Sequence, residues 1–149
     1  MSIAALLCLV VAVSDGDTLT ARCGAAHAPY QVKVRIAAID APETRQAFGP
    51  QARKNLTQLC LRQRARIQVL EKDRYHRNVA NVRCGNADVA TEQVRAGLAW
   101  VYTPYARQHP HLLPLQRQAQ ARSLGLWSQR RPLAPWAYRQ RYGTGYNQR

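Results

Sequence analysis

The sequence predicts an α+β protein built around a small closed β-barrel, and three observations support this prediction. Five short segments have the apolar alternation or the β-branched content of strands. A helical pattern separates the third segment from the fourth, and further helical patterns follow the fifth. The length of 149 residues suits one domain with its own core. This order is the layout of an OB-fold, so we expect a five-stranded OB-fold β-barrel with three α-helices.

The first three strands are expected in the amino-terminal third of the chain. Residues 8–14 are apolar and β-branched, and residues 18–23 return after the turn sequence Asp15-Gly16-Asp17. Residues 30–39 alternate between apolar and polar side chains, and Pro42 follows, a residue that cannot extend a strand. The three segments predict a β-meander.

The rest of the chain alternates between helical and extended patterns. Pro50 suits the first turn of a helix, and Gly97 and Gly125 suit the positions that follow helices. We therefore expect helices over residues 48–61, 89–96 and 110–123, strands over 64–70 and 79–84, and an extended segment over 98–102.

These boundaries place one domain over residues 7–128. The apolar run over residues 3–13 resembles the core of a signal peptide, but no positive charge precedes it and it is too short to span a bilayer. We interpret residues 1–6 as the remnant of a signal segment or a tag. Residues 129–149 form a basic tail rich in Arg, Pro and Tyr, which we expect to be loosely held.

The charge balance indicates an anionic partner. Lys and Arg number 22 against 8 Asp and Glu, which gives a formal net charge of +14. Nucleic acid is the common partner of such a compact basic domain, and no long amphipathic basic helix favours a membrane surface. A merely solubilising surface is the alternative. The sequence implies no stable protein partner, and we expect a monomer.

Acidic residues are few but clustered. Asp15, Asp17, Asp40 and Glu43 are half of all the carboxylates, and they lie in two short segments. A protein this basic has little reason to gather carboxylates unless they bind a cation or transfer protons. Hard oxygen ligands on irregular backbone suit Ca²⁺, with Mg²⁺ as the second choice.

Two arginines complete the pattern required for phosphodiester hydrolysis, which needs donors for the phosphate oxygens and a base that delivers water. Arg35 lies on the strand that leads to Asp40, and Arg77 follows a second polar loop. Glu43 follows Asp40 by three residues, so it can reach the same site without being a ligand.

Four cysteines, Cys8, Cys23, Cys60 and Cys84, match no zinc-binding spacing. In an oxidising compartment two disulfides are expected, with three possible connectivities. Cys8 and Cys23 flank the first hairpin at similar distances from its turn, which favours Cys8–Cys23 and, by elimination, Cys60–Cys84. Four buried thiols are the alternative.

Several segments in this order resemble the staphylococcal nuclease (thermonuclease) family, from about residue 8 to 127. The most specific are Asp15-Gly16-Asp17-Thr18, Arg35-Ile36-Ala37-Ala38-Ile39-Asp40-Ala41-Pro42-Glu43-Thr44 and Asp73-Arg74-Tyr75-His76-Arg77. The resemblance implies that Asp17, Asp40 and the Ala41 carbonyl bind calcium. It implies that Glu43 is the general base or water-orienting carboxylate, and that Arg35 and Arg77 bind the scissile phosphate.

The same resemblance implies a nuclease that cuts DNA and RNA and leaves 3′-phosphate ends. Tyr75 matches a tyrosine near the terminal phosphate of a bound nucleotide, and Asp15 an acid behind the metal ligands. A catalytically silent OB-fold nucleic-acid-binding module is the alternative function. Together with the cysteines and the signal-like segment, the resemblance to exported enzymes favours a secreted or periplasmic location.

Two departures from the family pattern affect the site. His76 stands where the family usually has glycine, next to Arg77, and the stretch between Glu43 and Phe48 is shorter than in the founding member.

Tyr105 is expected either to stack on bases or to pack at the rim of the core.

Overall fold

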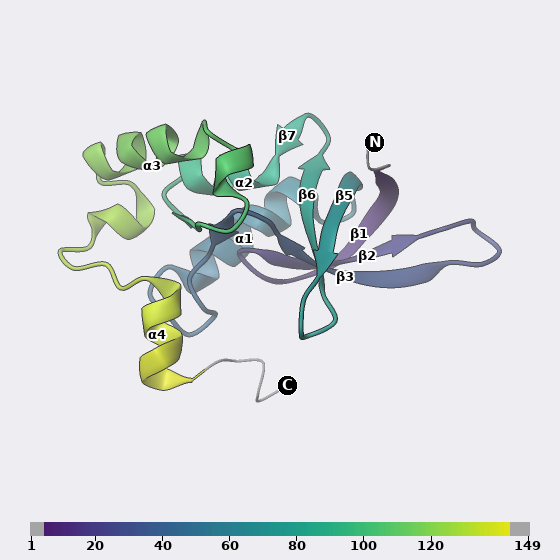
Figure 1. Ribbon diagram of the computed structural model, residues 1–149, viewed down its shortest axis with the longest axis horizontal. Coiled ribbons are helices and arrows are strands. Elements are labelled where there is room, and N and C mark those ends of the chain that lie inside the picture. Colours follow the sequence, from purple (N-terminus) through teal and green to yellow (C-terminus); the bar gives the residue numbers. More distant parts are fainter. Residues whose placement is uncertain (1–4, 144–149) are drawn as a thin grey trace.

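The computed structural model describes residues 5–143, and Figure 1 shows how their elements are arranged. In chain order these are β1 (Leu6–Asp15), β2 (Thr18–Cys23), β3 (Tyr30–Ile36), β4 (Ile39–Asp40), α1 (Gly49–Cys60), β5 (Arg64–Lys72), β6 (Asn78–Cys84), β7 (Ala87–Asp88), α2 (Val89–Arg95), β8 (Trp100–Val101), the 3₁₀ helix η1 (Ala106–Gln108), α3 (Leu112–Ala121), the 3₁₀ helix η2 (Gly125–Ser128) and α4 (Pro135–Tyr142).

Five strands close into a barrel. β1 pairs antiparallel with both β2 and β5, β2 pairs with β3, and β5 pairs with β6. A parallel pairing of β3 with β6 completes the ring, with Arg35 opposite Val79 in the register. A helix, α1, lies between the third and fourth barrel strands along the chain. The predicted α+β architecture, a five-stranded OB-fold barrel, is therefore confirmed.

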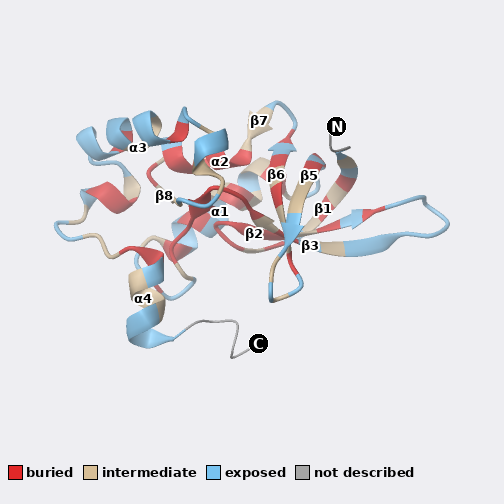
Figure 2. Ribbon diagram, viewed as in Figure 1, coloured by how far each residue is buried: buried red, intermediate tan, exposed pale blue. Residues whose placement is uncertain are grey.

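The barrel interior is the core of the molecule. Alternate residues of the strands, among them Val10, Leu19, Val34, Ile67 and Val82, are buried, as expected for strands with one face inside a barrel. In Figure 2 buried residues recur along the barrel strands and along α1, while the end of the β2–β3 hairpin is exposed. The alternation over residues 30–36 puts Val34 and Ile36 inside and leaves Arg35 on the opposite face.

The structure has one α-helix more than the sequence predicted. Three α-helices were expected, whereas residues 5–143 contain four, because residues 135–142 of the supposedly loose tail form α4. Pro135 at its first turn and Gly143 after its last are ordinary helix-boundary residues. At the other end β1 begins at Leu6, so this residue of the segment 1–6 belongs to the barrel. Residues 1–4 and 144–149 of the two terminal segments lie outside the described residues.

None of the helices within residues 5–143 has the length and apolar character needed to cross a bilayer.

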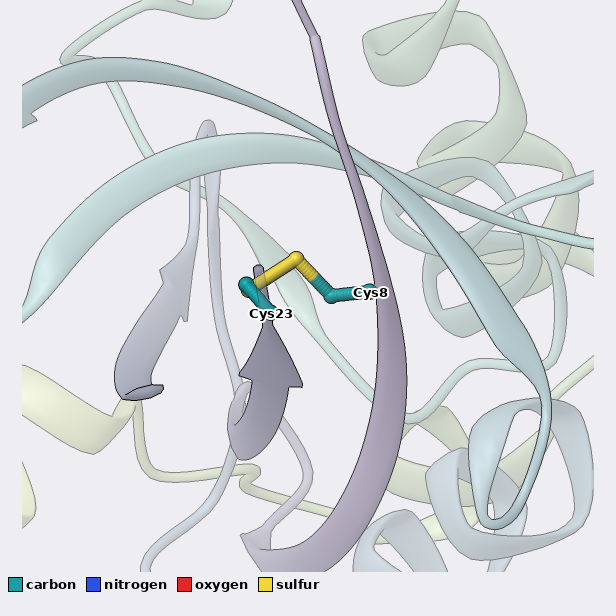
Figure 3. The surroundings of a disulfide bond; sticks show 2 residues. All are labelled: Cys8 and Cys23. Carbon is teal, nitrogen blue, oxygen red and sulfur yellow. A yellow bond between two sulfur atoms is a disulfide. The ribbon is translucent and has the colours of Figure 1, made fainter. Parts of the chain in front are cut away.

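Two disulfides tie the barrel together. Cys8–Cys23 joins β1 to β2, as Figure 3 shows, with a Cα–Cα distance of 4.5 Å. Cys60–Cys84 joins the end of α1 to the end of β6, with a Cα–Cα distance of 5.3 Å. These are the two pairs that the sequence favoured, and they leave no free cysteine in the described chain.

Reduction of the disulfides should destabilise the protein. They close loops with sequence separations of 15 and 24 residues, so each should contribute about 2–4 kcal/mol to the free energy of unfolding. Urea unfolding with and without dithiothreitol measures the loss. A native protein whose four thiols react with a thiol reagent, or an unfolding midpoint that dithiothreitol leaves unchanged, would contradict the pairing.

Candidate active site

One cavity of about 520 Å³ gathers the residues that the sequence singled out. Its lining includes all nine of them: Asp15, Asp17, Arg35, Asp40, Ala41, Glu43, Tyr75, Arg77 and Tyr105. They come from the end of β1, the β1–β2 turn, β3, β4, the segment after β4, the β5–β6 loop and the segment after β8. Residues separated by up to 90 positions in the sequence therefore share one site.

The β1–β2 turn is fixed against α1, and this fixes Asp17. A Cβ atom on Gly16 would lie 2.6 Å from the Cβ of Ala52 on α1, so only glycine allows this approach. The buried Gln93 of α2 locks the two elements together, because its Nε2 donates to the Gly16 carbonyl at 2.7 Å and to the Ala52 carbonyl at 2.9 Å.

Asp40 is held by a second pairing outside the barrel ring. β4 pairs antiparallel with β8, with Asp40 opposite Trp100. The next residue links the two aspartates directly, because the Ala41 N–H donates to Asp17 Oδ2 at 2.7 Å. The Thr18 hydroxyl donates to Asp17 Oδ1 at 3.1 Å. Backbone geometry thus brings two buried carboxylates to one place.

Arg35 supplies the positive charge between these carboxylates. Its Nη2 lies 3.6 Å from Asp17 Oδ2 and 3.5 Å from Asp40 Oδ1. The Asp40 side chain is 1% exposed and that of Arg35 14%. Charges so poorly solvated are tolerated only when they are paired and hydrogen bonded, so the three side chains stabilise one another.

The acids of this cluster differ in their protonation behaviour. Burial raises the pKa of Asp15 well above its usual value, and the neighbouring charge of Asp17 raises it further. Burial also opposes ionisation of Asp17, but the Arg35 guanidinium and hydrogen bonds from its neighbours together lower the pKa of Asp17. The pKa of Asp40 is raised, chiefly by burial. Asp15 therefore holds a proton more readily, and Asp17 is the more readily ionised carboxylate.

Glu43 is presented by a tight turn packed against the start of α1. The Gln46 N–H donates to the Glu43 carbonyl at 2.9 Å, and Gln46 Oε1 accepts from the Glu43 N–H at 3.1 Å. A Cβ on Gly49 would lie 2.1 Å from the same Glu43 carbonyl oxygen, so this close contact requires glycine. The Glu43 side chain is 13% exposed and faces the cavity.

Asp73, an acid within the β5–β6 loop, holds the Arg77 side chain in place. Asp73 Oδ2 accepts from Arg77 Nε at 2.8 Å, and its Oδ1 accepts from the backbone N–H groups of Tyr75 and Arg77 at 2.9 and 3.0 Å. His76, which replaces the usual glycine, has φ 63° in the left-handed region. A non-glycine residue there costs about 1–2 kcal/mol, and the loop keeps Arg77 in the cavity wall despite this cost.

Two tyrosines flank the cavity. The ring of Tyr75 lies under two guanidinium groups, with centroid distances of 5.0 Å to Arg74 and 5.3 Å to Arg77. Tyr105 packs against the core and also lines the cavity. A hydrogen bond between its hydroxyl and Glu71 raises the pKa of Tyr105.

Arg139 is a site residue that the sequence interpretation missed. It extends from α4, where its Nη2 lies 2.7 Å from Asp40 Oδ2, and its Nη1 lies 3.2 Å from Asp40 Oδ1 and 3.0 Å from Glu43 Oε1. Trp136, one turn earlier, packs its ring 5.5 Å from that of Trp100. Pro135 and Gly143 could have indicated the helix, but no local pattern indicates where an arginine 99 positions from Asp40 will lie.

The donors suit a hard cation. No group of three or more His, Cys, Asp or Glu side chains within residues 5–143 is arranged to hold a metal. The protein would therefore offer the Asp17 and Asp40 carboxylates and a backbone oxygen, with water completing the shell. Such a mixed oxygen shell is typical of calcium. Two guanidinium groups, those of Arg35 and Arg139, converge on Asp40, so this position favours positive charge.

The fold and the site define the class of protein: a small OB-fold barrel with buried acids and arginines in one cavity. Comparison with known proteins gives the family. The family described as staphylococcal nuclease homologue matches residues 33–129. The chain belongs to this family. Arg35, Asp40, Glu43 and Arg77 lie inside the matched region, whereas Asp17 and Arg139 lie outside it.

Related proteins extend the similarity over most of the chain. An uncharacterized endonuclease of Haemophilus influenzae is 40% identical over 132 residues, which cover 89% of this chain and 72% of the relative. A micrococcal nuclease of Shigella flexneri is 32% identical over 140 residues, covering 87% and 78%. A probable staphylococcal-like nuclease of Oryza sativa subsp. japonica is 35% identical over 114 residues, and this chain spans only 34% of that protein.

Loss of the Asp73 charge should loosen the Arg77 loop in a pH-dependent way. Burial opposes ionisation of Asp73, but hydrogen bonds from the loop and the Arg77 charge outweigh it and lower the pKa of Asp73. Its contribution, about 0.5–1 kcal/mol for a partly exposed pair, is therefore full above the unfolded pKa of about 3.9. It is lost as the pH falls through the lower pKa of the folded state.

Thermal unfolding of wild type and Asp73→Asn across this pH range measures the effect. We expect the variant to be less stable at pH 7 and equal to wild type at the acid end. Glu92→Gln removes a partly exposed acid of α2 that pairs with Arg95, and it should change little at either pH. If the difference in unfolding temperature between Asp73→Asn and wild type were the same at both ends of the pH range, it would contradict the role assigned to Asp73.

Proposed function

We propose that this protein is a calcium-dependent nuclease that hydrolyses phosphodiester bonds in DNA and RNA and leaves 3′-phosphate ends. One observation carries the proposal: Asp17, Asp40, Glu43, Arg35 and Arg77 line a single cavity in a strongly basic chain of the staphylococcal nuclease family. The names of the relatives as endonuclease and micrococcal nuclease support the same reaction.

In this proposal Asp17, Asp40 and the Ala41 carbonyl hold the calcium ion. When bound there, calcium supplies positive charge beside the phosphate oxygens. Asp17 is suited to this role because its lowered pKa keeps it ionised. The Ala41 N–H bond to Asp17 keeps the two ligand segments together.

Glu43 accepts a proton from the attacking water. The water oxygen forms a bond to phosphorus, and the bond from phosphorus to the 5′ oxygen breaks with its electron pair. The leaving 5′ oxygen takes up a proton, so the products are a 3′-phosphate and a 5′-hydroxyl. Arg35 and Arg77 donate hydrogen bonds to the phosphate oxygens, where negative charge develops in the transition state.

Tyr75 and Tyr105 line the same cavity and offer ring faces to nucleotides. The net charge of +14 supports sequence-independent attraction to the phosphate backbone, so binding should weaken steeply with salt. We propose that the protein acts as a monomer. The two disulfides support a secreted or periplasmic location, because such bonds persist in oxidising compartments.

Cleavage of single-stranded DNA with calcium and with a chelator tests the proposed function. We expect cleavage with calcium only, and products that a polymerase cannot extend until a phosphatase removes the 3′-phosphate. Glu43→Gln should lower the rate about 10²–10⁴-fold, the range for loss of a general base, and calcium binding should persist.

Glu92→Gln provides the matched control, because it removes the same charge from α2, away from the cavity. It should cleave at the wild-type rate. Equal cleavage with and without calcium would contradict metal dependence. Tight, salt-sensitive binding of DNA without cleavage would instead identify a silent OB-fold nucleic-acid-binding module.

A further inference from the structure

We propose that Arg139 of α4 is a displaceable counter-cation of the metal site: it occupies Asp40 and Glu43 in the metal-free protein and leaves the Asp40 carboxylate when a divalent cation binds. This inference rests on the proposed function, since it concerns the same carboxylates. It assigns to α4, which lies outside the family's matched region, a role in setting metal affinity.

Arg139 already occupies the carboxylate that a divalent cation would bind. The two terminal nitrogens of Arg139 bind both oxygens of Asp40, at 2.7 and 3.2 Å, and Asp40 Oδ1 also lies 3.5 Å from Arg35. A divalent cation would bind an Asp40 oxygen at about 2.3–2.6 Å. It would then lie against a guanidinium that already uses this carboxylate, and the two positive charges would repel each other.

The buried carboxylates of the site need compensating positive charge. Asp17, Asp40 and Glu43 are all largely shielded from water, with side-chain exposures of 7%, 1% and 13%. Arg35 pairs with Asp17 and Asp40, whereas Arg139 pairs with Asp40 and Glu43. Without a metal, buried carboxylates need such compensation. A bound divalent cation provides the same compensation, so Arg139 becomes dispensable for the balance once metal is present.

The helix α4 is held mainly by a few side chains at its edge. Pro135 is the buried residue of this helix, and Arg141 and Tyr142 are exposed. Beyond the Arg139 ion pairs, the contacts include Gln46 Nε2 donating to the Leu133 carbonyl at 2.6 Å and Trp136 packing on Trp100.

In Figure 1 the helix lies at the lower left, away from the labelled barrel strands and after a connecting segment, and Figure 2 shows much of it in the exposed colour. Moving the Arg139 end of α4 therefore disrupts little of the core. Release of Arg139 would also free a guanidinium at the cavity wall, where a phosphate of the substrate can accept its hydrogen bonds.

Calorimetric titration with calcium chloride tests the inference on the full chain, with no substrate present. If Arg139 competes with calcium, only the fraction of molecules in which Arg139 has left Asp40 can bind the ion. Removal of Arg139 makes every molecule competent, so the apparent affinity rises by the inverse of that fraction. We expect Arg139→Gln to bind calcium about tenfold or more tightly than wild type. Arg139→Lys keeps the charge but cannot bind both Asp40 oxygens in the same way, so its calcium affinity should lie between those of wild type and Arg139→Gln.

Arg141→Gln is the matched control. It removes one positive charge from an exposed position on the same helix, so it reports the general effect of net charge on calcium affinity. We expect its affinity to stay within about twofold of wild type. An affinity of Arg139→Gln that is no higher than that of Arg141→Gln would overturn the inference, while calcium binding by wild type would leave the proposed function standing. Absence of calcium binding by every one of these proteins would overturn both.

Tryptophan fluorescence gives a second readout that is independent of affinity and activity. Trp136 lies one turn before Arg139 and packs on Trp100 and Tyr102. Calcium should change the emission of wild type, and Trp136→Phe should remove most of that change. Arg139→Gln should resemble calcium-loaded wild type before any calcium is added. Saturation of wild type with calcium at unchanged emission would contradict displacement of α4.

Discussion

The pairing of two buried acids, Asp17 and Asp40, with Arg35 is the physical constraint that organises the site. Each of these side chains is largely removed from water, and each would be costly without the others. The fold satisfies the constraint with backbone: the β1–β2 turn is fixed on α1 by Gly16 and Gln93, β4 is fixed by β8, and the Ala41 N–H joins the two acids. The parallel closure of β3 against β6 then brings the Arg77 loop beside Arg35. The site residues on turns and loops are therefore held in place by contacts with the strands and helices of the barrel.

The same constraint explains why a chain of net charge +14 concentrates its few acids. Basic surface attracts a polyanion, but only a local excess of carboxylate can hold a divalent cation at the point of attack. In the proposed function this excess requires compensating positive charge, and Arg139 of α4 pairs with Asp40 and Glu43 in this structure. The polyanion and the metal would then bind to separate groups of charges.

Local patterns predicted the barrel and most of the cavity because the information lies in short segments. Alternation placed Val34 and Ile36 inside and Arg35 outside, and the spacing from Arg35 to Asp40 and Glu43 covers only nine residues. The Arg77 loop was harder, since His76 breaks the family pattern; the chain accepts a left-handed histidine there. The position of Arg139 in the site could not be predicted, because it depends on tertiary contacts between residues 99 and 96 positions apart. A basic, proline-containing tail has the composition of a loose segment, and only its contacts with the barrel mouth identify it as part of the site.

A crystal structure of the protein grown with calcium, or with a lanthanide that gives an anomalous signal, tests the proposal that the two buried aspartates form the cation site. We expect one strong peak between Asp17 and Asp40, about 2.3–2.6 Å from an oxygen of each and from the Ala41 carbonyl oxygen. A peak bound elsewhere on the chain, or a saturated crystal in which Arg35 and Arg139 still hold both carboxylates and no cation lies between them, would contradict it.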